Sequence, residues 1–236
     1  MRITIVGHAT VLIETGRYQV IVDPYFGSWG NVAYKRLAPP TRTREALAGV
    51  DLVLASHNHW DHVDGRYLRL LARDVPVVAP RWTSWLTRLI GARRVVGLRT
   101  WESRQFGPVT VTAVPALHIA VTAGYVVQAK GKRVYCAGDT YYGAFMHDIR
   151  RRFKLDVALM PVTTFRIPMT VGEQSAMRAV QALQPAVVIP IHLGLQPRFP
   201  LQRTGQTPEG FVRRLREAGL ETEVVMLPEG ETWTLT

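Results

Sequence analysis

The sequence predicts a layered α/β fold in which β-sheets are covered on the outside by helices. Short runs rich in β-branched residues come first, over 2–7, 10–15 and 18–23, and such runs bounded by turn residues are typical of strands. From residue 51 onward, apolar runs alternate with segments of helical spacing, and this alternation favours sheets with helices packed on their faces. The hydrophobic and charged fractions, 47% and 20%, are those of an ordinary soluble domain.

The chain shows no repeat, no low-complexity tract and no linker, so 1–236 is predicted to form a single domain. An irregular stretch over 24–49 follows the first three strands, and a loop of that length inside a domain is usually functional. Strands are then expected over 51–56, 76–80, 108–116, 123–131, 132–139, 155–162 and 186–192. Helices are expected over 64–73, 83–92, 143–153, 170–185 and 207–220, with strand-like segments again over 222–235.

Two of the predicted helices carry apolar residues that are spaced for one face. In the first of them the residues expected to face the core are Tyr67, Leu68, Leu70 and Leu71. At the start of the second, Trp82 and Trp85 lie three positions apart, a spacing that places both on one side of a helix. We therefore expect this tryptophan pair to pack in the core rather than to form a binding surface.

The formal net charge is +11, from 29 Lys+Arg against 18 Asp+Glu. Such an excess attracts phosphate-bearing partners, including nucleic acid, anionic lipid and phosphorylated metabolites. The arginine clusters, however, lack the interleaved aromatic residues of a platform for stacked bases. Solvated helix faces are therefore the favoured interpretation of these clusters, with nucleic-acid binding as the alternative.

The cellular compartment is predicted from what the sequence lacks. The single cysteine, Cys136, excludes an intrachain disulfide framework and fits a reducing environment. The apolar N-terminal stretch is interrupted by His8 and Glu14 and has no small-residue cleavage site. No run approaches the roughly 20 apolar residues that span a bilayer. We expect a cytoplasmic protein without a transmembrane segment.

Histidine and aspartate residues recur where the apolar runs end. These positions are His8, Asp23, His57, His118, Asp139 and His192. The loop HNHWDH adds His59, Asp61 and His62 to His57 within six positions. Strand ends at one rim of a sheet hold polar groups on a rigid scaffold, and burying such groups is costly unless something pairs with them. The sequence therefore predicts a cation site at this rim.

The types of the candidate ligands indicate which metals bind and how many. Imidazole and carboxylate without thiolate suit zinc, with manganese or iron as alternatives. In extended backbone His57 and His59 point the same way and can share one ion. Asp61 and His62 can face a second ion if the chain turns at the start of the next helix. A carboxylate can bridge two cations, so Asp139 is the expected bridge between two divalent ions.

The order and spacing of these histidine and aspartate residues resemble those of a known family. HNHWDH at 57–62, followed by His118, Asp139 and His192, is similar to the pattern HxHxDH…H…D…H of the metallo-β-lactamase superfamily. The resemblance covers almost the whole chain. It implies a four-layer αββα sandwich, with two mixed sheets flanked by helices and a dinuclear metal site at one edge.

Further motifs narrow the resemblance to one branch of the superfamily. GHATVLIE, DPYF, SHNHWDHVD and AGDTYY resemble the branch that holds N-acyl-phosphatidylethanolamine-hydrolysing phospholipase D and L-ascorbate-6-phosphate lactonase. By this resemblance one ion has the ligands His57, His59, His118 and Asp139. The other ion has the ligands Asp61, His62, Asp139 and His192.

The resemblance implies a metal-dependent hydrolase that uses a dinuclear metal-bound hydroxide. The expected substrate is an anionic small molecule with a phosphodiester, lactone or related ester bond. Asp61, Asp139 and His8 are the catalytic candidates, with Asp61 orienting the nucleophile and His8 in a second role near the site. One alternative is a nuclease acting on short RNA or DNA, and the other is a non-catalytic, metal-bound protein that binds nucleic acid.

Residues around the ligands are given supporting roles. Asp23 is expected to orient a ligand histidine from behind. The loops beside the rim are expected to set specificity through Phe26, Trp29, Phe165 and Phe199. Three arginines on these loops are candidates for a phosphate clamp: Arg166, Arg198 and Arg203.

Overall fold

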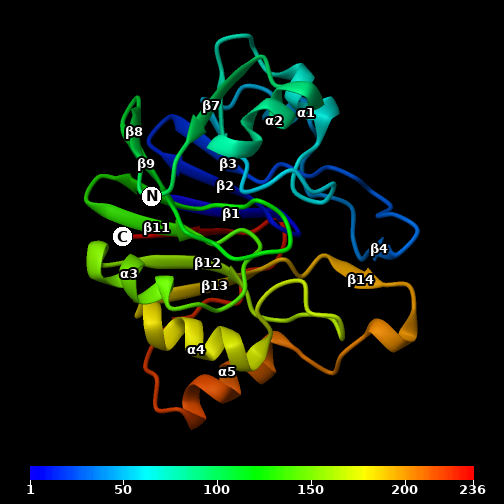
Figure 1. Ribbon diagram of the computed structural model, residues 1–236, viewed down its shortest axis with the longest axis vertical. Helices are drawn as coiled ribbons and strands as arrows, with labels where there is room; N and C mark the ends of the chain where they lie inside the picture. Colours follow the sequence, from blue (N-terminus) through cyan, green and yellow to red (C-terminus); the bar gives the residue numbers. More distant parts are fainter.

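Two mixed β-sheets form the centre of the computed structural model, which describes residues 1–236 (Figure 1). The first sheet has, in spatial order, β16 (Thr232–Thr234), β1 (Arg2–Gly7), β2 (Thr10–Thr15), β3 (Tyr18–Val22), β5 (Leu52–Leu54), β6 (Pro76–Pro80) and β7 (Arg94–Leu98). The second has β15 (Glu223–Val224), β13 (Val187–Ile191), β12 (Val157–Pro161), β11 (Lys132–Cys136), β10 (Gly124–Ala129), β9 (Val109–Val114) and β8 (Ser103–Phe106).

Helices cover the outer faces of the two sheets. The first sheet carries α1 (Gly65–Leu70) and α2 (Ser84–Ile90), and the second carries α3 (Phe145–Arg152), α4 (Glu173–Leu183) and α5 (Pro208–Glu217), as Figure 1 shows. Single 3₁₀ turns lie at Glu45–Leu47, Arg81–Thr83 and Pro200–Gln202. This is the four-layer αββα arrangement that the sequence led us to expect. No helix has the length and apolar character needed to cross a bilayer.

The largest apolar cluster lies between the two sheets and holds 27 buried residues. Val11 and Leu54 come from the first sheet, and Val127 and Leu159 come from the second. Burying one such side chain contributes about 1.5–3 kcal/mol relative to exposure. Because this layer joins the sheets face to face, it fixes the distance between their strand ends.

Strand direction brings polar residues to one edge of each sheet. In the first sheet β2 is antiparallel to both β1 and β3, and β3 is parallel to β5, so β1, β3 and β5 run the same way. In the second sheet β10 is antiparallel to both β9 and β11, while β11, β12 and β13 are parallel. The carboxyl ends of β9, β11 and β13 therefore also share one edge.

The predicted core of the two short helices is correct in part. Tyr67, Leu68 and Leu71 are buried, whereas Leu70 is 46% exposed at the last residue of α1. The prediction for the tryptophan pair was wrong, because Trp82 and Trp85 are 79% and 59% exposed. The opposite face of α2 packs on the sheet instead, with Ser84 close against Gly97 of β7. Small residues permit that close approach, and the tryptophans are left on the outer side.

Four strands formed where none was predicted, namely β4 (Tyr34–Arg36), β7, β8 and β14 (Leu195–Pro197). The pair β4–β14 joins two segments that the sequence presented as irregular, with Gln196 opposite Lys35. In Figure 1 this pair projects at the right of the sandwich as an arm. The pairing is a contact between distant parts of the chain, so no local pattern announces it.

Candidate metal centre

Six strands deliver polar side chains to the same place. His8 follows β1, Asp23 follows β3, and the loop 57–62 follows β5. From the second sheet, His118, Asp139 and His192 come after β9, β11 and β13. The parallel directions described above explain why these residues meet, since each lies beyond the carboxyl end of its strand.

Sharp backbone turns at these strand ends aim the side chains. His8, Asp23 and His192 have positive φ angles of 55°, 45° and 65°, a region that His, Asp and Asn occupy more readily than other non-glycine residues. Gly138, just before Asp139, has φ 58°, and a Cβ there would lie 2.5 Å from Cβ of Ser56. Glycine is therefore required at position 138, where the chain after β11 packs against Ser56.

The first ligand cluster consists of His57, His59 and His118. Their ring nitrogens lie within 4.8 Å of one another, and His118 Nε2 is 3.4 Å from His59 Nδ1. Burial, followed by the neighbouring His62, lowers the pKa of His57 well below its usual value. Burial also lowers the pKa of His59 and His118. All three imidazoles are therefore neutral at pH 7, the state in which they bind a metal.

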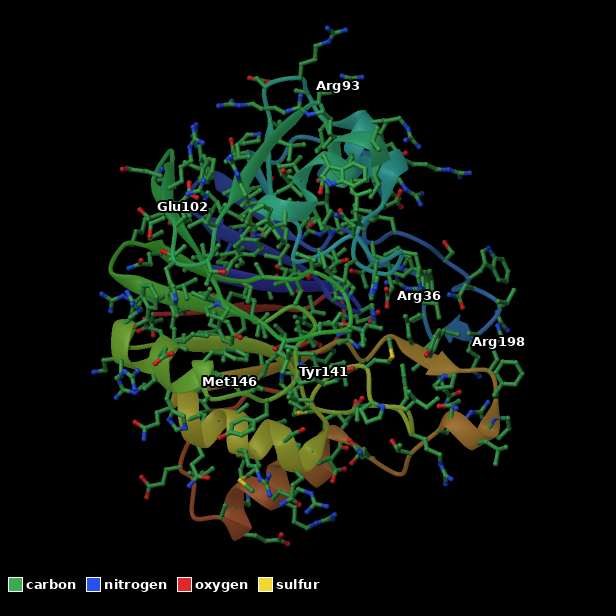
Figure 2. All side chains as sticks on the ribbon, viewed as in Figure 1. Arg36, Arg93, Glu102, Tyr141, Met146 and Arg198 are labelled. Atoms are coloured by element: carbon green, nitrogen blue, oxygen red, sulfur yellow. The ribbon has the colours of Figure 1, made fainter.

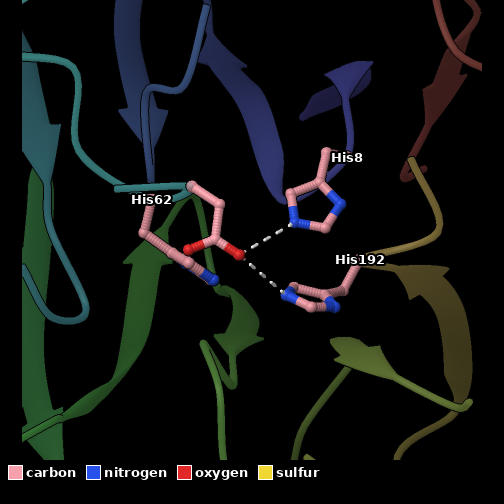
Figure 3. A group of neighbouring side chains, drawn as sticks. His8, His62 and His192 are labelled. Carbon is pink, nitrogen blue, oxygen red and sulfur yellow. Dashed lines mark ion pairs between the residues drawn. The ribbon is translucent and has the colours of Figure 1, made fainter. Parts of the chain in front are cut away.

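The second cluster consists of His8, Asp61, His62 and His192, again with ligand atoms within 4.8 Å of one another. Asp61 Oδ2 lies 3.7 Å from His8 Nε2 and 3.8 Å from His192 Nε2. The dashed lines that end at His8 and His192 in Figure 3 mark these two ion pairs. Burial would raise the pKa of Asp61, but the surrounding histidines lower it below its usual value. Asp61 therefore carries its negative charge throughout the physiological range.

Asp139 connects the two clusters. Its Oδ1 lies 3.3 Å from both His62 Nε2 and His192 Nε2, and its Oδ2 lies 3.9 Å from His118 Nε2. Burial acts to raise the pKa of Asp139, but His192 and His62 outweigh it and hold that pKa well below the usual value. One carboxylate thus presents one oxygen toward each cluster.

A buried network behind the ligands fixes their orientation. Asp23 Oδ2 lies 2.9 Å from His62 Nδ1 and accepts a hydrogen bond from Ser56 Oγ at 2.8 Å. Ser56 Oγ in turn lies 2.9 Å from His57 Nδ1. Asp23 therefore holds a histidine of each cluster, directly for His62 and through Ser56 for His57. The expected role of Asp23 is present, whereas the part of Ser56 was missed because a lone serine carries no signal in the sequence.

The donor set fits divalent cations. Buried atoms without a hydrogen-bond partner include His57 Nε2, His62 Nε2, His192 Nε2 and Asp139 Oδ1. Unpaired polar atoms at such depth are costly. Two ligands that each lie about 2.0–2.2 Å from one zinc ion are roughly 3–3.8 Å apart at common coordination angles. The separations of 3.3–3.9 Å between Asp139 and the histidines are close to this range and too long for good hydrogen bonds.

A pocket of about 220 Å³ opens onto both clusters. It reaches His59, Asp61, Asp139 and His192 at its floor. Its walls are aromatic and aliphatic: Tyr34, Trp60, Ile119, Phe165, Met169 and Leu195. No lysine or arginine lines it. A molecule that enters this pocket therefore meets apolar walls rather than a positively charged clamp.

The structure brings together every residue predicted for the site. His8, His57, His59, Asp61, His62, His118, Asp139 and His192 all lie in the two clusters or between them. The pocket walls were predicted less well. Phe165 lines the pocket, but Phe26 is buried in the core beside Tyr67. Trp29 and Phe199 are exposed and do not line it.

The predicted arginine clamp does not form at the pocket. Arg198 donates hydrogen bonds to the carbonyls of Asn31 and Trp29, and Arg203 donates to those of Pro197 and Arg198. Both therefore brace the arm, and Figure 2 shows Arg198 near its outer end. Arg166 is exposed and does not line the pocket either. Loop arginines satisfy neighbouring carbonyls readily, and this use of their donors was not visible in the sequence.

Comparisons with known proteins identify the family to which the chain belongs. Residues 18–193 match the family described as Beta-lactamase superfamily domain. A UPF0173 metal-dependent hydrolase of Archaeoglobus fulgidus is 30% identical over 248 aligned positions, which cover 99% of this chain and 98% of that protein.

Solved structures show the same fold. Igni18, a metallo hydrolase from Ignicoccus hospitalis, has a TM-score of 0.78 at 24% identity, over 100% of this chain and 99% of that one. A possible metal-dependent hydrolase from Veillonella parvula has a TM-score of 0.82 at 19% identity, with the same coverage.

The fold and the matched family define the class of protein. The chain belongs to the metallo-β-lactamase superfamily. Within it, the chain is a metal-dependent hydrolase similar along its whole length to the archaeal relative. The predicted superfamily, fold and general enzyme class are thereby confirmed.

Proposed function

We propose that the protein hydrolyses an ester or lactone bond of a small molecule by means of two divalent ions. His57, His59, His118 and Asp139 would hold one ion, and Asp61, His62, Asp139 and His192 the other. The observation that carries the proposal is Asp139, whose two carboxylate oxygens face different clusters. Zinc is the proposed metal because the ligands are imidazoles and carboxylates in compact sets. A reducing, cytoplasmic location belongs to the proposal and is supported by the single free thiol.

The chain's own residues have distinct tasks in this proposal. Bound divalent ions lower the pKa of a water molecule and polarise a carbonyl or phosphoryl oxygen. Asp61, ionised and open to the pocket, accepts a hydrogen bond from the attacking water and so orients it. Tyr34 lines the same pocket, and its pKa is raised, first by burial and then by the charge of Asp61. A protonated Tyr34 is suited to give a proton to the leaving group.

The pocket narrows the substrate class. Its walls bear no positive side chain, so a phosphodiester would find only the metals to balance its charge. The aromatic and aliphatic walls suit an uncharged molecule with an apolar group next to the bond that is cut. We therefore favour an apolar carboxylic ester or lactone over the anionic substrate expected from the sequence. The nuclease alternative gains no support here, since a nucleic-acid chain requires basic side chains along its path.

The test combines metal analysis with a substrate panel. Protein purified without chelator is expected to contain about two equivalents of metal per chain and to hydrolyse apolar aryl esters or lactones faster than bis(p-nitrophenyl) phosphate. Asp61→Ala should lower kcat/KM by about 10²–10³, the range for losing one key polar group at the reaction centre. Asp148→Ala, which changes a partly exposed acidic residue on α3 that does not line the pocket, is the matched control. Less than half an equivalent of metal after reconstitution, or equal activity of both variants, would reject the proposal.

A further inference from the structure

We infer that His8 is a fifth protein ligand of the second metal, in addition to the four that the family pattern supplies. The inference rests on the proposed two-metal site and concerns a residue that precedes the HNHWDH motif by about fifty positions. Three independent features of His8 support it: its unpaired nitrogens, its distance from Asp61, and its locked backbone.

The first feature is the burial of His8 without a hydrogen-bond partner. The side chain has no exposed area, and neither Nδ1 nor Nε2 makes a hydrogen bond. A buried imidazole with two unpaired nitrogens is costly, and a structural histidine would be expected to satisfy at least one of them. A metal next to Nε2 removes the part of that cost that comes from Nε2.

The second feature is the separation from other donors. His8 Nε2 lies 3.7 Å from Asp61 Oδ2, and His192 Nε2 lies 3.8 Å from the same oxygen. Both distances exceed the range of a good hydrogen bond and match two ligands on one ion, roughly 3–3.8 Å apart. His8 and His192 therefore stand in equivalent positions relative to Asp61, as Figure 3 shows.

The third feature is a backbone that is held from both sides. The His8 N–H donates to Glu229 Oε1 at 2.8 Å, and the His8 carbonyl accepts from the His192 N–H at 3.0 Å. These bonds maintain the left-handed conformation of His8, with φ 55°. Strained backbone persists at functional sites where the surroundings enforce it. The chain thus fixes His8 directly to another proposed ligand.

The additional ligand makes the two sites unequal. The second ion would have five protein donors: His8, Asp61, His62, Asp139 and His192. The first would have four, which leaves it more room for water or substrate. A site with five nitrogen and oxygen donors exceeds the four of an ordinary tetrahedral zinc site. It is accordingly better suited to ions that accept higher coordination numbers, such as Mn²⁺ or Co²⁺.

The test is cobalt titration of His8→Asn, followed by absorption spectroscopy. Asparagine tolerates a positive φ, so the variant removes the imidazole and keeps the backbone. We expect two Co²⁺ equivalents in the wild type and a second equivalent bound at least about tenfold more weakly in the variant. Its visible absorption should strengthen as the coordination number falls. His147→Asn, which changes an exposed histidine on α3, should match the wild type in both respects.

A second variant covers the case in which His8→Asn does not fold. His8→Gly also allows the positive φ, and a pocket of about 230 Å³ that His8 lines together with Glu229 gives free imidazole a path to the vacated space. Added imidazole should restore binding of the second Co²⁺ and the wild-type spectrum. If either variant still binds two equivalents of Co²⁺ tightly and its spectrum is unchanged, the inference about His8 is overturned, while the proposed function still stands. Failure of the wild type to bind two equivalents would reject the proposed function as well.

Discussion

The two ligand clusters lie at the same edge of the sandwich but differ in charge. The cluster of His57, His59 and His118 contains only imidazoles, and each has a lowered pKa. The other cluster contains Asp61 and also His62, whose two ring nitrogens face the carboxylates of Asp23 and Asp139. Burial would lower the pKa of His62, but Asp139 and Asp23 raise it well above the usual value.

This difference predicts different requirements for metal binding. The first cluster is already neutral and can accept an ion without releasing a proton. The second offers a carboxylate of its own, which strengthens attraction for a cation, but His62 must lose a proton before Nε2 can bind. We therefore expect metal binding at the first cluster to depend less on pH near neutrality than metal binding at the second.

Removal of the shared carboxylate should have the largest effect. Asp139→Asn abolishes the charge that faces both clusters, so we expect metal content to fall in both sites and kcat/KM to fall by about 10³ or more. Elemental analysis and ester hydrolysis measure the two effects. Activity within tenfold of the wild type would mean that the clusters do not act through Asp139.

The network behind the ligands allows the clusters to be perturbed separately. Asp23→Asn should weaken metal binding at both clusters by about 10–100-fold, the usual cost of losing a partner behind a ligand. Ser56→Ala removes the contact with His57 and the hydrogen bond from Ser56 Oγ to Asp23, but it leaves Asp23 next to His62. It should therefore weaken the first cluster more than the second. The affinities of the two equivalents, measured by chelator competition, distinguish these outcomes. Equal losses in both variants would contradict the arrangement.

Acidification should weaken the second site before the first. Below the raised pKa of His62 a proton competes with the metal, so affinity should fall by up to about tenfold per pH unit for a single proton. The first cluster should hold its affinity to lower pH because its histidines stay neutral. Metal titrations at pH 8, 7 and 6 provide the measurement. Parallel loss at both clusters would show that the difference in charge does not control binding.

The smallest expected effect is the pH dependence of the stability of the metal-free protein. Four histidines have lowered pKa values, with that of His8 at about 3, caused first by burial and then by His192. At pH values below the ordinary histidine pKa but above these lowered values, the unfolded chain binds more protons than the folded chain. The free energy of unfolding therefore falls as the pH falls through this interval. The raised pKa of His62 has the opposite effect on the pH dependence of stability. It offsets the contribution of one of the four histidines with lowered pKa values.

Melting temperatures of chelator-treated protein should therefore fall from pH 7 to pH 5. The fall should be smaller in His57→Asn, which removes one of the four histidines with lowered pKa values. A melting temperature that rises over this interval would give the wrong sign for the net proton count.

Much of the candidate site could be predicted because many of its residues belong to short motifs in the sequence. His57, His59, Asp61 and His62 lie within six residues, and each remaining ligand follows an apolar run that reads plainly as a strand. Because β2 is antiparallel to both β1 and β3, and β3 is parallel to β5, the residues after β1, β3 and β5 share an edge. The pairing of β4 with β14 and the walls of the pocket had no such signal, because they depend on contacts between distant loops.

The sequence by itself determined the superfamily, the layered fold and the identity of the residues at the rim. Apolar periodicity sets the strands, and ligand chemistry sets the metal-binding character, and both are local properties. The sequence also suggested Asp139 as a bridge, but only the tertiary structure decided which of its oxygens faces which cluster. Only the tertiary structure decided that Asp23 holds a histidine of each cluster and that His8 and His192 lie at similar distances from Asp61. These relations depend on how the two sheets are joined across their shared core, and the position of one sheet relative to the other is not contained in any single segment.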